Sequence, residues 1–300
     1  MKLRVLAAAM ACALLAGPAL AQDDAGAAGE RQKLIESLHF QTGDIALSDA
    51  NAHIHLQPGF RYLDKGDARK VLEDLWGNPP DEEVLGLLVP DNAGLASDHS
   101  WAVVLTYSNE DGHIADEDAA KIDYAQMLTD MKTSIHDGND ERKKAGYGTM
   151  ELVGWAEPPH YDAQTKKLYW AKELDFSDAN SHTLNYDIRV LSRDGYLSLE
   201  AVADMADQGL VKEGMQQVLP MAEFDSDHRY ADYKPGTDKL AAYGLAALVA
   251  GGVAAKTGLL AKIGIMLLAA KKLVILGIAA IGALLKKIFG GKGRGGGTVS

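Results

Sequence analysis

The charge and hydropathy of the chain change abruptly near residue 238, and this break limits the possible folds more than any other feature. Residues 238–300 contain nine Lys or Arg and one acid, a net charge of +8. The whole chain carries −12 and the first 21 residues +2, so residues 22–237 carry −22. So acidic a body repels nucleic acid and anionic lipid, whereas the basic end is drawn to anionic lipid surfaces. We therefore expect a folded acidic body, no nucleic-acid partner, and a separate C-terminal region at a membrane.

The apolar C-terminal region begins with residues 240–261, which contain one lysine near their far end. As a helix they would be about 33 Å long, enough to cross the hydrocarbon layer of a bilayer. The next run, residues 262–289, is interrupted by Lys271 and Lys272, and two ammonium groups at mid-bilayer are strongly unfavourable. We predict a transmembrane helix at 240–261, a membrane-associated basic amphipathic segment at 262–289, and a disordered tail at 290–300.

Small residues recur along this predicted transmembrane helix. Ala246, Ala250 and Ala254 are four positions apart, with Gly251 and Ala255 beside two of them. Such spacing lets two helices approach closely in a membrane. The helix is therefore expected to pack against another copy and to give a homo-oligomer.

The other end of the chain has the pattern of a secretory signal peptide at residues 1–21. Lys2 and Arg4 precede a short apolar run, and Ala-Leu-Ala at residues 19–21 is a small-x-small cleavage site. Cys12, the only cysteine, lies inside this segment, so the exported chain would have no disulfide and no catalytic thiolate. Residues 22–42 are expected to be flexible and to end in a short helix.

Between these ends, residues 43–237 read as one α+β domain. "GDIALSDANAHIHLQP" and "TLNYDIRVLSRDGYLSLEA" alternate with period two around turn residues and predict β-hairpins. "GDARKVLEDLWG" and "DEDAAKIDYAQMLTDMKTSI" predict helices, the second with Asp116 as its N-cap. Many strands joined by short hairpins indicate a largely antiparallel sheet with helices packed on it.

Several segments carry a family resemblance. "LQPGFRYLDKGDARKVLEDLWGNPP", "DGHIADEDAAKIDY", "GWAEPPHYD", "LNYDIRVLSRDGYLSL" and "RYADYKPGTDKLAAYGLAALVAGG" resemble the membrane-anchored bacterial proteins grouped as domain of unknown function 2167. The resemblance runs from about residue 43 to the membrane segment and implies an anchored envelope protein, with no catalytic residue to carry over. A weaker, architectural resemblance is to the α/β sandwich of PsbP-like and Mog1-like domains.

Two histidines are candidates for a metal site. His53 and His55 alternate on a predicted strand, so both point to one face, where His39 or Asp44 is conceivable as a third ligand. We favour a solvated strand face, because no metal-ligand spacing completes the set. "NEDGHIADED" fails as a calcium loop, since Tyr107 falls at the first ligand position. Neither Ser-Asp-His tripeptide lies in a nucleophile elbow. We expect no metal, no cofactor and no catalytic residue.

The stretch "GWAEPPHYDAQTKKLYWAKEL" allows two interpretations. In the first, Trp155 and Trp170 lie near the two ends of one loop and hold a β-hairpin together. In the second, these tryptophans and a rigid aromatic lip bind a protein or peptide; the lip consists of Pro158, Pro159, His160 and Tyr161.

The leading functional hypothesis is a non-enzymatic, membrane-tethered envelope module whose acidic body binds a protein or peptide. The signal peptide and the positive-inside bias place the body in the periplasm, the anchor in the bacterial inner membrane and the basic tail in the cytoplasm. One alternative is a membrane-assembly component acting through its small-residue helix. Another is an unrecognised hydrolase that uses His and Asp residues.

Overall fold

The computed structural model describes residues 28–78, 80–97, 99–144 and 147–250. These residues belong to two compact units that divide after Leu38. In the first unit, residues 28–36 form a helix, where the sequence predicted one. The second unit contains all the elements that follow.

A seven-stranded sheet forms the centre of the second unit. Its order is β3-β4-β5-β9-β8-β7-β6, and every neighbouring pair is antiparallel, as predicted. The strands are β3 (Phe60–Asp64), β4 (Val84–Pro90), β5 (Val103–Ser108), β6 (Met150–Asp162), β7 (Lys167–Phe176), β8 (Thr183–Leu191) and β9 (Tyr196–Asp204).

A smaller sheet has three antiparallel strands in the order β1-β2-β10. They are β1 (Asp44–Leu47), β2 (Ala52–His55) and β10 (Ala222–Phe224). The first two form the hairpin predicted from "GDIALSDANAHIHLQP". The chain turns through the 3₁₀ helix η1 (Ser48–Ala50) and then Asn51, whose φ of 50° a short polar side chain tolerates.

The helices are short, and most begin directly after a strand or turn. They are α2 (Lys65–Arg69), the π-helical turn η2 (Lys70–Leu75), η3 (Ala119–Lys121), α3 (Tyr124–Asp137), α4 (Asn139–Lys144), η4 (Met205–Asp207), α5 (Gln208–Val218), η5 (Tyr230–Asp232) and α6 (Leu245–Ala250). Asp116, the predicted N-cap of the helix in "DEDAAKIDYAQMLTDMKTSI", does not cap it. Asp123 caps α3 by accepting from the N–H groups of Ala125 and Gln126, while the carboxylate of Asp116 binds elsewhere.

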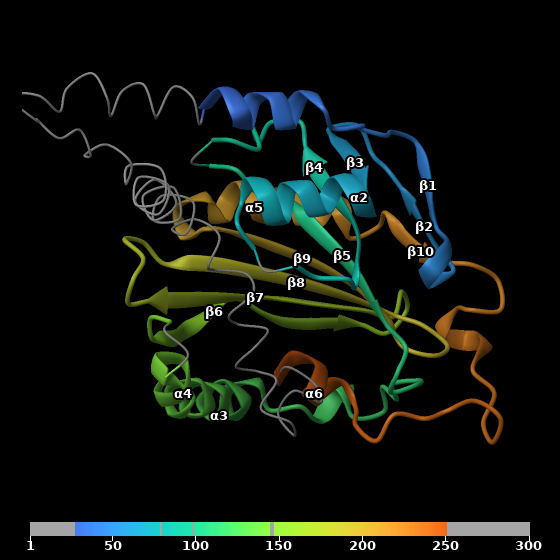
Figure 1. Cartoon of the computed structure of the whole chain (residues 1–300). Coiled ribbons are helices and arrows are strands. Elements are labelled where there is room, and N and C mark those ends of the chain that lie inside the picture. Colours follow the sequence, from blue (N-terminus) through green and yellow to red (C-terminus); the bar gives the residue numbers. More distant parts are fainter. Residues whose placement is uncertain (1–27, 79, 98, 145–146, 251–300) are drawn as a thin grey trace, which may run out of the picture. The chain divides into compact units, whose positions relative to one another are not determined.

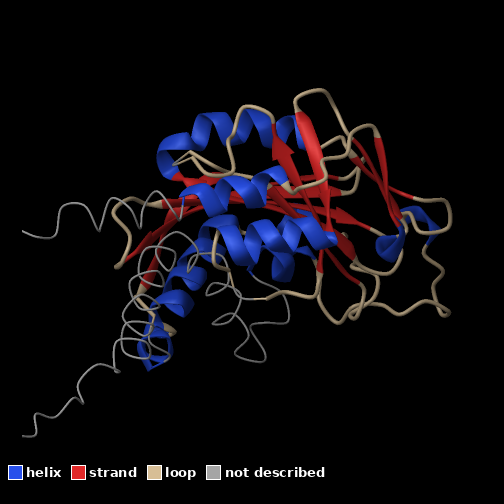
Figure 2. Ribbon diagram, turned by 45° about the horizontal axis from the view of Figure 1, so that its top comes forward, coloured by secondary structure: helices blue, strands red, loops and turns tan. Residues whose placement is uncertain are grey.

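The main core lies between the large sheet, α5 and the three-stranded sheet. Figure 1 shows α5 on one side of the large sheet and α3, α4 and α6 on the other, and Figure 2 shows the strands running between helices. Alternate residues of β8 and β9 enter this core: Leu184, Tyr186, Ile188 and Val190, then Leu197, Leu199, Ala201 and Ala203. Helix α5 contributes Val211, Met215 and Val218, which recur at helical spacing.

The opposite face of the sheet is covered by α3, by α6 and by the segment that leads to α6. Leu168 and Trp170 of β7 pack there against residues of α6, and Leu152 and Leu174 pack against Met131 of α3. Because both faces are covered, every residue of β8 except the half-buried Arg189 is buried.

The predicted hairpin in "GWAEPPHYDAQTKKLYWAKEL" exists, but its boundaries were wrong. β6 extends through residues 157–162, so "EPPHYD" is strand rather than loop, and the turn lies at residues 163–166. β6 is an edge strand, and its pairing with β7 shifts register between Trp155 and His160. Pro158 and Pro159 lie in the register shift between Glu157 and His160, where neither is paired with a residue of β7, so their missing N–H groups are tolerated on this edge strand.

The predicted transmembrane helix at 240–261 lies partly outside the described residues, and its described part, residues 240–250, packs on the body. Leu240 pairs with His113 in an isolated β-bridge, the helix begins only at Leu245, and its apolar side chains are buried in the body. Within residues 28–250, apart from the four undescribed positions, no helix has the length and apolar character needed to span a membrane. The remaining predictions, for residues 1–21, 251–261, 262–289 and 290–300, lie outside the described residues.

We predict that Trp170→Ala will be among the most destabilising single changes in the sheet. Trp170 is 1% exposed, and truncating a buried tryptophan lowers the free energy of unfolding by about 3–5 kcal/mol. Val153→Ala on β6 is the control, because Val153 is 39% exposed and should lose under about 0.5 kcal/mol. Chemical denaturation of both variants measures the difference, and equal losses would contradict the assigned packing.

Candidate functional site

The carboxylate of Asp116 accepts hydrogen bonds from three side chains that lie far from it in the sequence. The hydroxyl of Tyr161 donates at 2.6 Å, Lys166 Nζ at 2.6 Å and the hydroxyl of Tyr230 at 3.0 Å. We call these four residues the Asp116 cluster. They come from four places in the chain: the segment after β5, the end of β6, the β6–β7 turn and η5.

The electrostatics of the cluster favour an ionised Asp116. Burial by itself raises the pKa of this carboxyl, but the hydrogen bonds from Lys166, Tyr161 and Tyr230 outweigh burial and hold the pKa below its usual value. Burial, followed by the contact with Asp116, raises the pKa of both tyrosine hydroxyls. At neutral pH the tyrosines are therefore neutral donors to a carboxylate, which makes these hydrogen bonds strong.

His113 lies next to the cluster, against the rings of Tyr233 and Tyr230. Its ring is 3.9 Å from the ring centre of Tyr233 in a stacked arrangement and 4.3 Å from that of Tyr230. Nδ1 lies 3.2 Å from the carbonyl oxygens of Ser192 and Arg193, so it carries the proton and donates it. Burial lowers the pKa of His113, which favours the neutral ring.

The loop that contains Gly112 and His113 also binds the segment that precedes α6. His113 N–H donates to the carbonyl of Lys239 at 2.9 Å, and Ala241 N–H donates to the carbonyl of His113 at 2.8 Å. Gly112, with a φ of +91°, permits the approach, because a Cβ there would lie 2.4 Å from the Lys239 carbonyl oxygen. Arg193 donates two hydrogen bonds to the carboxylate of Asp238, at 2.6 and 2.8 Å.

Helix α6 then completes the attachment through apolar packing. Leu245, Leu248 and Val249 are buried at 0%, 4% and 1% exposure. They share one cluster with Ile114 and Trp170. Burying each of these three side chains stabilises the folded protein by at most about 1.5–3 kcal/mol. Residues 238–250 are therefore part of the folded body.

This arrangement is suited to fastening one segment to another. Each of the four side chains in the Asp116 cluster already takes part in a hydrogen bond within the cluster. Among the residues that the structure describes, no three His, Cys, Asp or Glu side chains gather as metal ligands would.

A second charged network lies on the same face of the sheet, between strands β7, β8 and β9. Arg189 donates to Asp187 at 3.1 Å and also to Glu200, while Lys172 Nζ lies 3.3 Å from Asp187 Oδ2. That oxygen has no hydrogen-bond donor in the described part of the chain, so the Lys172 contact is an ion pair of imperfect geometry. Trp170 lies under both cations, with the guanidinium 5.3 Å from its ring centre.

Burial affects the two carboxylates of this network differently. It raises the pKa of Asp187 above the usual range despite the attraction of Lys172. Burial also raises the pKa of Glu200, but Arg189 and Lys172 outweigh it, and the net pKa is lowered. A buried network of two cations and two acids is electrically balanced, and losing one member leaves an unpaired buried charge.

The metal candidates His53 and His55 lie on β2, on the exposed face of the three-stranded sheet. Their Nδ1 atoms face the two oxygens of Asp44, at 3.1 and 2.8 Å, and the rings stack 6.0 Å apart. Asp44 is thus the neighbour that the sequence suggested. His39 is not, because its Nδ1 faces Asp67 at 3.0 Å.

The residues of the expected lip do not form one surface. Tyr161 points inward to Asp116, Trp170 is buried, and the half-buried Trp155 donates its indole N–H to the carbonyl of Tyr124 at 3.4 Å. The tryptophans are not cross-strand partners either, because Trp155 pairs with Lys172 and Trp170 pairs with Asp187.

The rest of the lip is divided between the surface and the interior. Pro158 and His160 are exposed, Pro159 is buried, and the His160 ring lies 5.1 Å from that of Tyr169. The four residues of the expected lip therefore do not share one face, because alternate residues of a strand point to opposite sides.

The small residues expected to pack transmembrane helices are partly in the body. Ala246 and Ala250 belong to α6, and Ala250 packs against the apolar cluster around Met131. Gly251, Ala254 and Ala255 lie outside the described residues.

Sequence reasoning missed the Asp116 cluster, His113 and the charged network on β7, β8 and β9. One signal for the network was available: Asp187 and Arg189 interrupt β8, whose other residues are uncharged. Nothing in the local pattern of "HIADED" distinguished a carboxylate that binds tyrosines from one that caps a helix.

We predict that Asp116→Asn will destabilise the protein in a pH-dependent way. Hydrogen bonds to a charged group contribute about 1.5–3 kcal/mol, so the loss in free energy of unfolding should fall in or below this range. Because the folded pKa lies below the unfolded value of about 4, the stabilisation is present above that pH and is lost as the pH falls through the folded value. Urea denaturation from pH 7 downwards should show wild type and variant converging in acid.

Asp74→Asn is the matched control, since the exposed side chain of Asp74 makes no hydrogen bond within the described residues and acts on Lys70 only through its charge. It should leave the stability difference near zero at every pH. A loss for Asp116→Asn that does not change with pH would refute an ionic role for this carboxylate.

Solved structures that are similar to this chain have low identity and low TM-scores. The cyanobacterial PsbP protein (CyanoP) of Synechocystis sp. PCC 6803 is 10% identical, covering 63% of this chain and 93% of its own, with a TM-score of 0.35. The Ran-binding protein Mog1p of Saccharomyces cerevisiae is 11% identical, covering 62% of this chain and 96% of its own, with a TM-score of 0.32. No curated protein matches the sequence.

The family comparison covers most of the chain. The profile described as "Protein of unknown function (DUF2167)" matches residues 39–282, a range that includes the Asp116 cluster and α6. The chain therefore belongs to the DUF2167 family.

Proposed function

We propose that this protein is a non-enzymatic module of the bacterial envelope, tethered to the inner membrane by its C-terminal segment, which presents an acidic body to a protein or peptide partner in the periplasm. The observation that carries the proposal is the docking of residues 238–250. The apolar C-terminal region begins as part of the body, tied to it by Arg193, His113 and the buried side chains of α6.

Docking removes the linker that would otherwise separate the body from its anchor. A flexible linker of several residues lets a domain tumble above a membrane, whereas a packed helix restricts its orientation. Because residues 240–250 are in the body, the membrane-inserted part of the proposed anchor lies within residues 251–289. The lysines of that region, among them Lys271 and Lys272, would extend towards headgroups.

Charge supports the same orientation. The body carries −22 between residues 22 and 237, and an anionic membrane surface repels it. Tethering through a basic segment overcomes this repulsion locally while the body remains free to attract basic partners. The alternative of assembly through a small-residue helix is less well supported, because Ala250 already packs on its own body.

Cysteine labelling in spheroplasts tests the proposed topology. Cys12 should leave with the signal peptide, so introduced cysteines would be the only thiols. Gln164→Cys, in the exposed β6–β7 turn, should react with a membrane-impermeant maleimide, and Thr298→Cys should react only after the membrane is permeabilised.

Both outcomes are needed. If Thr298→Cys labels from outside, the tail does not enter the cytoplasm. If Gln164→Cys is protected in spheroplasts and reacts after lysis, the body is not periplasmic and the proposal fails.

A further inference from the structure

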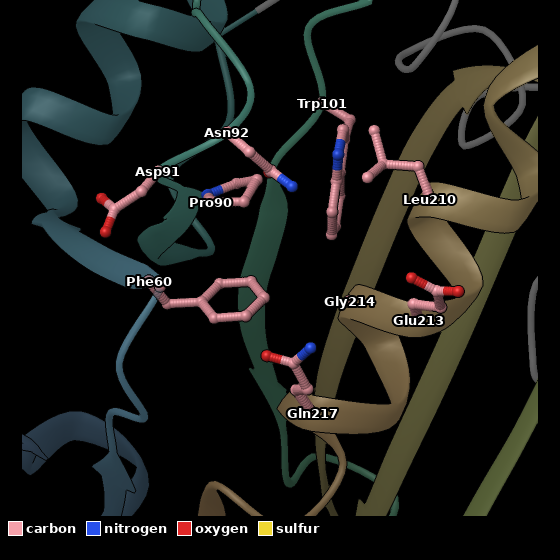
Figure 3. A pocket seen from close by; sticks show the side chains of 10 residues that line it. Phe60, Pro90, Asp91, Asn92, Trp101, Leu210, Glu213, Gly214 and Gln217 are labelled. Atoms are coloured by element: carbon pink, nitrogen blue, oxygen red, sulfur yellow. The ribbon is translucent and has the colours of Figure 1, made fainter.

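The two faces of the large sheet each bury a tryptophan, in different surroundings. Trp101 lies on the α5 side, where Figure 3 shows it near Phe60 at a pocket of about 170 Å³. Pockets for small-molecule ligands usually occupy roughly 300–1,000 Å³, so this one is too small for a cofactor. Trp170, on the other face, lies under Lys172 and Arg189 of the charged network. The face of Trp170 therefore brings an amine together with buried carboxyl groups, which can react with each other.

Three neighbouring strands bring the amine and the carboxyl groups to one place. Asp187 of β8 is the cross-strand partner of Trp170 on β7 and of Glu200 on β9. Directly opposed residues of an antiparallel pair point to the same face, and Lys172 shares that face because it lies two residues after Trp170. The side chain of Asp187 is 3% exposed and that of Lys172 is 20% exposed. Amine and carboxyl group are thus held together largely away from water.

The two oxygens of the Asp187 carboxyl group have different neighbours. Oδ1 accepts a hydrogen bond from the Arg189 guanidinium at 3.1 Å. Oδ2 lies 3.3 Å from Lys172 Nζ, yet it receives no hydrogen bond within the described residues. Groups held in contact by a fold reach effective concentrations of roughly 10⁵–10⁸ M, enough to favour a condensation that water opposes in solution. The nitrogen is therefore placed beside the oxygen that would leave in such a condensation.

The electrostatics of the two carboxyl groups differ in the way that a condensation requires. Burial raises the pKa of Asp187 despite the attraction of Lys172, so this group holds a proton more readily and its hydroxyl can leave as water. Burial also raises the pKa of Glu200, but Arg189, Lys172 and a hydrogen bond with Asp187 outweigh burial and lower it. Glu200 therefore stays ionised and can accept a proton from the ammonium.

We propose that Lys172 and Asp187 join in an intramolecular isopeptide bond, which the folded protein forms without another enzyme. Glu200 takes a proton from the Lys172 ammonium, and the nitrogen lone pair attacks Cγ of Asp187. The Arg189 guanidinium stabilises the negative charge that develops on Oδ1. The bond from Cγ to Oδ2 then breaks, and the hydroxyl takes the proton back from Glu200 and leaves as water. The second proton that the nitrogen loses passes to the solvent, so atoms and charge balance.

The bond supplies a cross-link that cysteines cannot supply in this chain. Cys12 is the only cysteine, so no disulfide can form within one molecule. The isopeptide bond joins β7 to β8, the two strands that lead into and out of the turn at residues 177–182. The site lies within the sheet and does not depend on the membrane tether, so its test can fail while the proposed topology holds.

Tryptic digestion of the full-length protein, purified in detergent and then denatured, tests the bond. Trypsin cleaves after an unmodified Lys172 and then yields peptides 168–172 and 173–189. An isopeptide bond blocks this cleavage, so we expect one peptide, residues 168–189, that is lighter by one water molecule. Tandem mass spectrometry should find no backbone fragments from between Lys172 and Asp187, because the ring holds them together. A succinimide at Asp187 has the same mass loss but leaves Lys172 cleavable.

A pair of variants tests the proton transfer. Glu200→Gln removes the proton acceptor at nearly constant shape, and it should slow bond formation by roughly a hundredfold or more, the range for general acid–base catalysis. Glu213→Gln, with the same loss of charge at an exposed position of α5, should form the bond at the wild-type rate. The measurement is the fraction of uncleaved peptide 168–189 at successive times after a pulse of synthesis, and circular dichroism reports that each variant is folded.

Wild-type protein that yields peptides 168–172 and 173–189 at their unmodified masses would overturn the proposal, whatever the variants do. A lighter peptide 168–189 that still gives backbone fragments from inside residues 172–187 would also overturn it, because such a peptide contains no ring. Equal rates of bond formation in folded Glu200→Gln and Glu213→Gln would overturn the role assigned to Glu200.

Discussion

The loop at residues 111–116 binds the segment at 238–241, and this contact determines how the C-terminal part of the domain is attached to the rest. Two backbone hydrogen bonds link His113 to Lys239 and Ala241, and the close approach requires a glycine at position 112. Asp116 then fixes the far end of the same loop by accepting from Tyr161, Lys166 and Tyr230. Without this contact α6 would lack a fixed starting point, and its three buried apolar residues would have no defined surface to cover.

Charged groups in the interior strengthen the specificity of the sheet more than its stability. Lys172, Asp187, Arg189 and Glu200 all lie on one face of β7, β8 and β9, and the other face of β8 and β9 enters the main apolar core. A one-residue slip of β8 would carry Asp187 and Arg189 into the main core, at the full penalty of burying unpaired charge. A buried ion pair adds little net stability in the native register, yet it disfavours every wrong one.

The strength of a local pattern decided what the sequence could reveal. Alternation around short turns predicted the β1–β2, β6–β7 and β8–β9 hairpins and hence the antiparallel sheet, because side-chain period follows directly from strand geometry. It could not place the end of β6, since Pro158 and Pro159 normally signal a loop and are tolerated here only by the edge position. An N-cap motif likewise matched Asp116, but contacts with Tyr161 and Tyr230, 45 and 114 residues away, decided its role.

The apolar run from Leu240 shows what hydropathy alone cannot predict. Hydropathy cannot tell whether Leu245, Leu248 and Val249 are removed from water by lipid or by protein, because both environments are apolar. In the described chain they pack on Ile114 and Trp170.

Amide hydrogen exchange of the full-length protein in lipid nanodiscs tests the central claim, that residues 238–250 are held in the body. The amides of His113 and Ala241 are hydrogen-bonded across the contact, at 2.9 and 2.8 Å. They should exchange as slowly as the amides of β8, because opening the contact exposes buried apolar surface. If both exchange as fast as the exposed turn at residues 163–165, the segment is not docked in the membrane-bound protein and the claim is contradicted.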